Sequence, residues 1–134
     1  MDYTLIGPIA IFIAAILNQI LGALWYSPKF LGNAWASILG LNEEFLKPTI
    51  GKVLSSFGIS VVTAWVLSLF LQLIGATTIA ECMIIAFFLW LGFIATTHLS
   101  GVIWAHKPFK AYLIDTLFAL ISLEAMAIVL SFWL

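Results

Sequence analysis

The chain has 134 residues, of which 64% are hydrophobic and only 8% charged, and its mean hydropathy is +1.20. A typical soluble domain is about 45–50% apolar and about 25% charged. The five basic and six acidic side chains of this chain are too few to cover a water-exposed surface. A lipid bilayer is therefore the expected environment. With a net charge of −1 and no arginine, the chain gives no reason to expect nucleic acid as a partner. Its single cysteine, Cys82, excludes an intrachain disulfide framework.

Four long apolar stretches follow one another along the chain. Each exceeds the roughly 20 residues that a helix needs to cross a hydrocarbon core, and they cover about residues 5–26, 53–74, 82–105 and 111–134. The stretches lack the alternation of a β-barrel. Because no basic residue precedes the first stretch, a cleavable signal peptide is not expected. We predict an all-α integral membrane four-transmembrane-helix bundle, with residues 1–134 forming a single transmembrane domain.

A short amphipathic interfacial helix is predicted between transmembrane helices one and two, over about residues 28–39. Ser27-Pro28 has the form of an N-cap followed by a proline in the first turn. The apolar side chains after it fall on one helical face as far as Leu39, and Gly40 is suited to end the helix. A helix of this pattern lies on a membrane surface.

All the basic side chains flank the first and third connections between the predicted spans. They are Lys29, Lys47, Lys52, Lys107 and Lys110. Because lysine is retained on the cytoplasmic side of a membrane, this side is predicted to be cytoplasmic, and both termini are predicted to face outward. Aromatic residues typical of interfacial belts cluster at the two boundaries. Those at the cytoplasmic boundary are Trp25, Tyr26, Trp35, Trp104 and Tyr112, and those at the outer boundary are Tyr3 and Trp133.

Two blocks of sequence carry a resemblance to a known family. The first block comprises Gly22, Trp25, Tyr26, Ser27, Pro28, Gly32 and Trp35, and the second runs from Lys107 to Asp115. Together they resemble the signatures of the prokaryotic membrane family called domain of unknown function 1761, although Lys107 stands where arginine is expected and His106 where an acid is usual. The resemblance implies a small four-helix protein of a bacterial inner membrane, and it implies no activity.

Three polar residues, Asn18, His98 and Asp115, lie inside the predicted spans at similar depth. Asn18 is about 12 Å from the cytoplasmic boundary, and His98 and Asp115 are each about 9 Å from it, at about 1.5 Å per residue. They are predicted to form one polar layer. His98 and Asp115 then make either a titratable pair in a water-accessible cavity or a hydrogen-bonded clamp between the last two spans. A third reading has Lys110 reaching Asp115.

Glu124 follows Asp115 by nine residues, which places it on the opposite face of the last helix at about 100° per residue. Counting from the helix ends puts it near the bilayer midplane, level with Trp90 and Trp65. Indole N–H groups are plausible partners for a carboxyl group at that depth. Three readings stay open: a hydrogen bond inside one chain, a contact between copies in an oligomer, and ion or proton conduction.

Small residues recur every four positions in three of the spans and predict faces of close helix packing. They include Ala10 and Ala14 in the first span, Ser56, Ser60, Ala64 and Ser68 in the second, and Gly92, Thr96 and Ser100 in the third.

Two functions are compatible with these features. The first is an oligomeric transport or channel-like component that uses the buried acids and His98, and the second is a non-catalytic subunit that docks a partner membrane protein. No nucleophile and base are suitably placed for an enzyme, so no catalytic residue is predicted. Neither a cofactor nor a metal site is expected, because the two histidines are too few and too far apart.

Overall fold

A computed structural model describes residues 7–134, which form helices and connecting turns without any strand. Four helical segments are long and apolar enough to cross a membrane. They are α1 (Pro8–Trp25), α3 (Ile50–Ile74), the continuous segment Ile79–Trp104 and α6 (Phe109–Ser131). A short helix, α2 (Gly32–Leu39), lies between α1 and α3 and is followed by one 3₁₀ turn, η1 (Glu43–Leu46). The predicted fold class is confirmed. Tyr3 lies outside the described residues.

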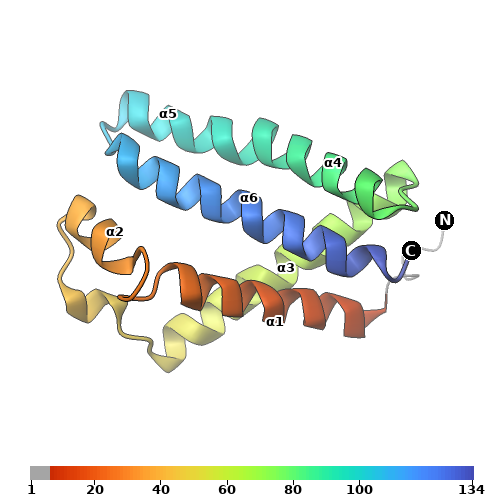
Figure 1. Ribbon diagram of the computed structural model, residues 1–134, viewed down its shortest axis with the longest axis horizontal. Helices are drawn as coiled ribbons and strands as arrows, with labels where there is room; N and C mark the ends of the chain where they lie inside the picture. The colour runs from red at the N-terminus through yellow and green to blue at the C-terminus, as the bar shows by residue number, and fades with distance from the viewer. Residues whose placement is uncertain (1–6) are drawn as a thin grey trace.

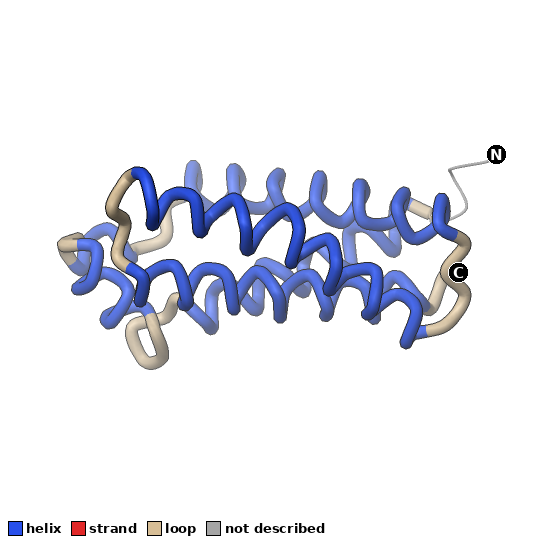
Figure 2. The backbone as a smooth tube through the Cα atoms, turned by 90° about the horizontal axis from the view of Figure 1, so that it is seen from above, coloured by secondary structure: helices blue, strands red, loops and turns tan. Residues whose placement is uncertain are grey.

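The helix α6 lies in the middle of the bundle (Figure 1). It packs against α1 on one side and against the third span on the other, while α3 lies mainly along α1. Figure 2 shows the helices running along one common axis, with the connections gathered at two ends. One end carries α2, η1 and the turn between α5 and α6, and so it holds all five lysines. We call it the lysine end.

The third span is divided by a π-helical segment. Its parts are α4 (Ile79–Leu89), η2 (Trp90–Ala95) and α5 (Thr96–Trp104), and η2 is the π-helix. The buried positions follow a spacing of four residues from Cys82 to Ala86, and the next buried position is Ala95, nine residues further along. A π turn takes an extra residue, so η2 changes which face of the span points toward α6.

The core consists largely of small side chains, as close helix packing in a membrane requires. Ala10 and Ala14 of α1 and Ser60, Ala64 and Ser68 of α3 are buried, on the faces that their spacing predicts. In the third span the same spacing is misleading, because its predicted small residues are exposed. These residues are Gly92, Thr96 and Ser100. A repeat of small residues indicates a smooth helix face but does not tell which side of the bundle that face meets.

The boundaries of α2 and of the third span differ from the sequence-based ranges. The helix α2 begins at Gly32 rather than at position 28, because Ser27 does not cap it: the Ser27 carbonyl accepts from Phe30 and Gly32 in tight turns, and its hydroxyl donates to the Leu24 carbonyl. Gly40, with φ of 69°, ends α2 as predicted. The third span begins at Ile79, after a capping box of Thr78 and Glu81.

Candidate functional site

Two consecutive residues at the end of α1 bind two consecutive residues of α6. The Tyr26 hydroxyl donates to Asp115 Oδ1 at 2.5 Å, and Trp25 Nε1 donates to the Ile114 carbonyl oxygen at 3.2 Å. Both aromatic rings also pack on the ring of Phe118, with centroid distances of 6.0 Å for Trp25 and 5.3 Å for Tyr26. The two sequence blocks that carry the family resemblance therefore meet in space.

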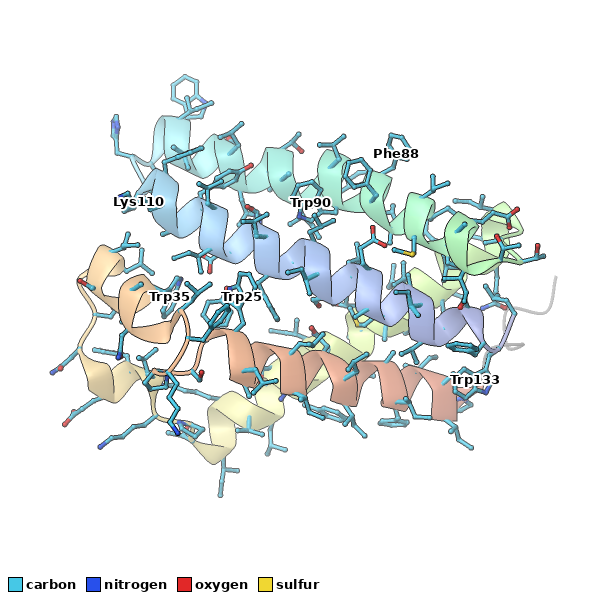
Figure 3. The ribbon with its side chains drawn as sticks, viewed as in Figure 1. Trp25, Trp35, Phe88, Trp90, Lys110 and Trp133 are labelled. Carbon is cyan, nitrogen blue, oxygen red and sulfur yellow. The ribbon has the colours of Figure 1, made fainter. Side chains whose placement is uncertain are left out.

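The helix α2 covers this contact from the lysine end. The Trp35 ring packs edge-on against the Tyr26 ring, with a centroid distance of 5.4 Å and an interplanar angle of 71°, and Figure 3 places Trp35 beside Trp25 at this end of the bundle. Gly32 allows the approach, since a Cβ atom there would lie 2.1 Å from the Tyr26 carbonyl oxygen. The motif glycine thus serves a close backbone contact that fixes α2 onto α1.

Tyr26 is held as a neutral donor. Burial, reinforced by the hydrogen bond to Asp115 and by its charge, raises the pKa of the Tyr26 phenol far above its ordinary value. The hydroxyl therefore keeps its proton to a higher pH than an ordinary tyrosine does, and it stays a hydrogen-bond donor to Asp115.

One pocket lies on the α1 side of Tyr26, between α1, α3 and η1, with a volume of about 560 Å³. We call it the α1–α3 pocket. Lys52, Gln19, Ser56 and Tyr26 are among its lining residues, and Ser60 is the deepest along α3. Asn18 Nδ2 donates to Ser60 Oγ at 2.8 Å, and the Ser122 hydroxyl donates to Asn18 Oδ1, so α1, α3 and α6 are joined at this depth.

A second pocket lies on the other side of the Tyr26–Asp115 bond, between α5 and α6, with a volume of about 400 Å³. We call it the α5–α6 pocket. Asp115, His98 and Lys107 line it, together with Thr97, and Leu39 of α2 contributes to its wall. Tyr26 lines the first pocket and Asp115 lines the second, so their hydrogen bond joins a residue of one pocket wall to a residue of the other.

The predicted polar layer of Asn18, His98 and Asp115 is not one cluster. Asn18 lines the α1–α3 pocket, whereas His98 and Asp115 line the α5–α6 pocket. His98 Nδ1 contacts the Ile94 carbonyl of its own helix at 2.9 Å, and Asp115 bonds to Tyr26 rather than to His98 or Lys110. The layer fails because Asn18 lies at another depth: it bonds to Ser122, seven residues or about 10 Å beyond Asp115 along α6, whereas Tyr26 is the residue that meets Asp115. His98 is exposed, and Asp115 is only partly buried.

Two aromatic donors fasten the third span to α6 in place of a His98–Asp115 clamp. Trp90 Nε1 donates to the Thr116 carbonyl at 2.7 Å, and the Tyr112 hydroxyl donates to the Ala95 carbonyl at 2.9 Å. These bonds reach the first and last residues of η2. Sequence reasoning placed Tyr112 in an interfacial belt and did not assign this role to it, since nothing in the sequence marks η2.

Glu124 does not have the indole partners that its position predicts. Trp90 meets α6 at Thr116, eight residues or about 12 Å before Glu124, and Trp65 is 52% exposed. Glu124 Oε2 is shielded from solvent and has no hydrogen-bond partner among the described residues. The pairing fails because the π-helix and the register of the hairpin bring Trp90 to a different turn of α6.

Ser60 and Ser122 complete the Asn18 contact and were not predicted as site residues. Ser60 belongs to the small-residue repeat of α3, which is the one signal that could have found it. Across residues 7–134, no group of three or more His, Cys, Asp or Glu side chains is arranged to hold a metal ion.

The chain also matches the model of a known protein family. The family model described as Protein of unknown function (DUF1761) matches residues 9–131, a range that includes both blocks at the Tyr26–Asp115 contact. No curated protein and no solved structure shows a significant match.

Proposed function

We propose that this chain, which belongs to the DUF1761 family of proteins of unknown function, is a non-enzymatic component of a membrane transport system. The proposal rests on the site itself. In this proposal the chain works as an oligomer in a bacterial inner membrane, with its lysine end in the cytoplasm and both termini outside. The solute is small and polar, and it enters the α5–α6 pocket from the lysine end.

The observation that carries this proposal is the position of Asp115. Its carboxyl group lies inside a membrane span, six residues or about 9 Å beyond the start of α6, and it lines an open pocket together with His98 and Lys107. Ionisable groups at such depth are costly and typically line solute or ion pathways. A purely structural carboxyl group has no need of a pocket beside it.

The Tyr26–Asp115 bond, which joins a residue of each pocket wall, supports a gated path for the solute. Opening the Tyr26–Asp115 bond would connect the α5–α6 pocket with the α1–α3 pocket, which reaches Ser60. Beyond that depth Ala14 and Ala64 are fully buried in the core of the bundle, so the path is proposed to continue between copies of the chain. Because four short helices leave little room for an alternating-access cavity, the proposal includes assembly of several copies.

The non-enzymatic part of the proposal rests on the hydrogen bonds of the described hydroxyl groups. In residues 7–134 the bonded Ser and Thr side chains pair with backbone groups, with Asn18, with Gln19 or with Glu81, and none pairs with His98. A nucleophile activated by a neighbouring base would require such a pair.

Flux in proteoliposomes tests the proposal. Wild-type protein is reconstituted, and the movement of protons and of candidate solutes is followed with an entrapped pH-sensitive dye and with isotope uptake. Asp115→Asn is expected to remove the flux, whereas Glu124→Gln, which changes an acid of the same helix outside both pockets, is expected to retain it. Background flux of all solutes with assembled wild-type protein would reject the transport function.

A second candidate function, a subunit that docks a partner membrane protein, is favoured by Glu124 alone. A carboxyl oxygen shielded from solvent without a partner is costly, and a neighbouring helix could supply the missing donor. This function predicts a specific membrane protein that co-purifies in mild detergent and is lost in Glu124→Leu. Recovery of self-associated chains alone would speak against it.

A further inference from the structure

We propose that the α5–α6 pocket binds a small zwitterion that carries a primary ammonium group and an anionic group a few bonds apart, of the chemical class of phosphoethanolamine. Asp115 receives the ammonium group, and Lys107 receives the anion. The inference rests on the proposed function, because it names the solute class of the same pocket.

The first argument is the pair of opposite charges on the pocket wall. Lys107 and Asp115 are its only lysine, aspartate or glutamate residues, and all its lining residues lie in the described part of the chain. Lys107 lies two residues before the start of α6, and Asp115 lies about two turns further along, so one charge stands at the mouth and the other deeper. A ligand with one charge would leave the other wall charge unpaired, whereas a zwitterion satisfies both.

The second argument is the conformation of Lys107. Its backbone N–H donates to the Gly101 carbonyl at 3.3 Å, and its side chain then lies along α5 at Gly101. A Cβ atom on Gly101 would sit 3.3 Å from Lys107 Cδ and 3.8 Å from Nζ. The missing side chain of Gly101 therefore lets the ammonium group of Lys107 stay at the pocket wall, one helical turn from His98.

The third argument is the supply of acceptors at the other end of the pocket. Tyr26 binds Oδ1 of Asp115, which leaves the second carboxylate oxygen for a ligand. His98 Nδ1 lies 2.9 Å from the Ile94 carbonyl oxygen, which only accepts, so Nδ1 is the donor in this contact, and in the tautomer with its proton on Nδ1 the other nitrogen, Nε2, is an acceptor. An ammonium group has three donors. The two acceptors suit a primary amine better than a quaternary one, which has no N–H.

Titration calorimetry of the full chain in detergent, with phosphoethanolamine as the probe, tests the inference. Wild-type protein is expected to bind it saturably. Lys107→Gln and Asp115→Asn should each weaken binding by about tenfold or more, as expected for a lost charge-assisted hydrogen bond. Lys110→Gln and Glu124→Gln are matched controls, since they change a lysine and an acid of the same helix that do not line the pocket, and both should bind as wild type does. Lys107 is exposed, so its substitution does not threaten the fold.

Related probes define the ligand class. Ethanolamine alone, inorganic phosphate alone and phosphocholine should each bind about tenfold more weakly or worse, because each lacks one of the two contacts. Nanodiscs containing phosphatidylethanolamine, compared with nanodiscs of phosphatidylglycerol, separate a lipid headgroup from a free solute. Inhibition of probe binding only by phosphatidylethanolamine would assign the same chemistry to a lipid headgroup.

Binding and flux separate the two proposals. Equal affinity of wild type, Lys107→Gln and Asp115→Asn, or no binding to folded wild type, overturns the zwitterion site. If Asp115-dependent flux persists in that case, the transport function stands with another solute class. Binding that depends on Lys107 and Asp115 without flux of any solute supports the site and rejects transport.

Discussion

The Tyr26 hydroxyl donates to the carboxyl group of Asp115, 89 residues further along the chain, and joins the end of α1 to α6 beside the Trp25–Ile114 bond. Tyr26→Phe removes the donor but keeps the ring packed against Phe118 and Trp35. We expect a loss of about 1–3 kcal/mol in the free energy of unfolding, because the bond involves a charged, partly buried group. Unfolding in mixed detergent micelles measures it.

Tyr112→Phe is the matched control for this prediction, because it removes a hydroxyl bonded to a neutral carbonyl, that of Ala95. Its expected cost is smaller, about 0.5–1.5 kcal/mol. An equal or larger loss for Tyr112→Phe would mean that the Tyr26–Asp115 bond has no special weight.

The titration of Tyr26 provides a second prediction. Since folding raises the pKa of this phenol, the unfolded chain releases the proton first as the pH rises. The contribution of Tyr26 to stability is therefore complete below about pH 10, the unfolded value, and is lost progressively above it. In a chain with Tyr3→Phe and Tyr112→Phe, ultraviolet absorbance should show no tyrosinate at a pH where a model tyrosine peptide is ionised. Titration together with the peptide would contradict the burial.

The two motif glycines should respond differently to alanine. A Cβ atom on Gly32 would overlap the backbone oxygen of Tyr26 at 2.1 Å, whereas one on Gly22 would meet only the Phe118 ring edge at 3.4 Å, an ordinary contact. Gly32→Ala is expected to displace α2 and to expose Trp35, and Gly22→Ala is expected to leave α2 in place. Quenching of tryptophan fluorescence by a soluble quencher compares them, and similar quenching in both variants would argue against the close approach.

The spans were predictable from the sequence because membrane insertion depends on length and hydropathy alone, and α1, α3 and α6 carry that signal in their composition. The capping box of Thr78 and Glu81 was not predicted, and the third span was expected to begin at 82 rather than at Ile79, although the spacing of the box is local. These features need no knowledge of the neighbouring helices.

The site was predictable only in part, because it depends on how the helices face one another. Asp115 and Tyr26 were each singled out, but nothing in either segment tells that they meet. The π-helix η2 has no composition of its own, and it turns Trp90 toward Thr116 and away from Glu124. Asn18 was predicted to lie level with Asp115 but contacts Ser122, seven residues further along α6, because counting residues from predicted helix ends does not fix the register between packed helices.

The orientation of the chain in the membrane is the last prediction, and it follows from the lysines. All five lie at the end of the bundle that carries α2 and the α5–α6 turn, and basic residues are retained on the cytoplasmic side. His106, in the α5–α6 turn, and Thr77, in the α3–α4 turn, are both exposed and lie at opposite ends. Single cysteines at these positions, in a Cys82→Ala background, report the side that each end faces. In intact cells a membrane-impermeant maleimide should label Thr77→Cys and spare His106→Cys until the membrane is opened. Labelling of His106→Cys alone in intact cells would reverse the orientation and place the α5–α6 pocket mouth on the outer surface.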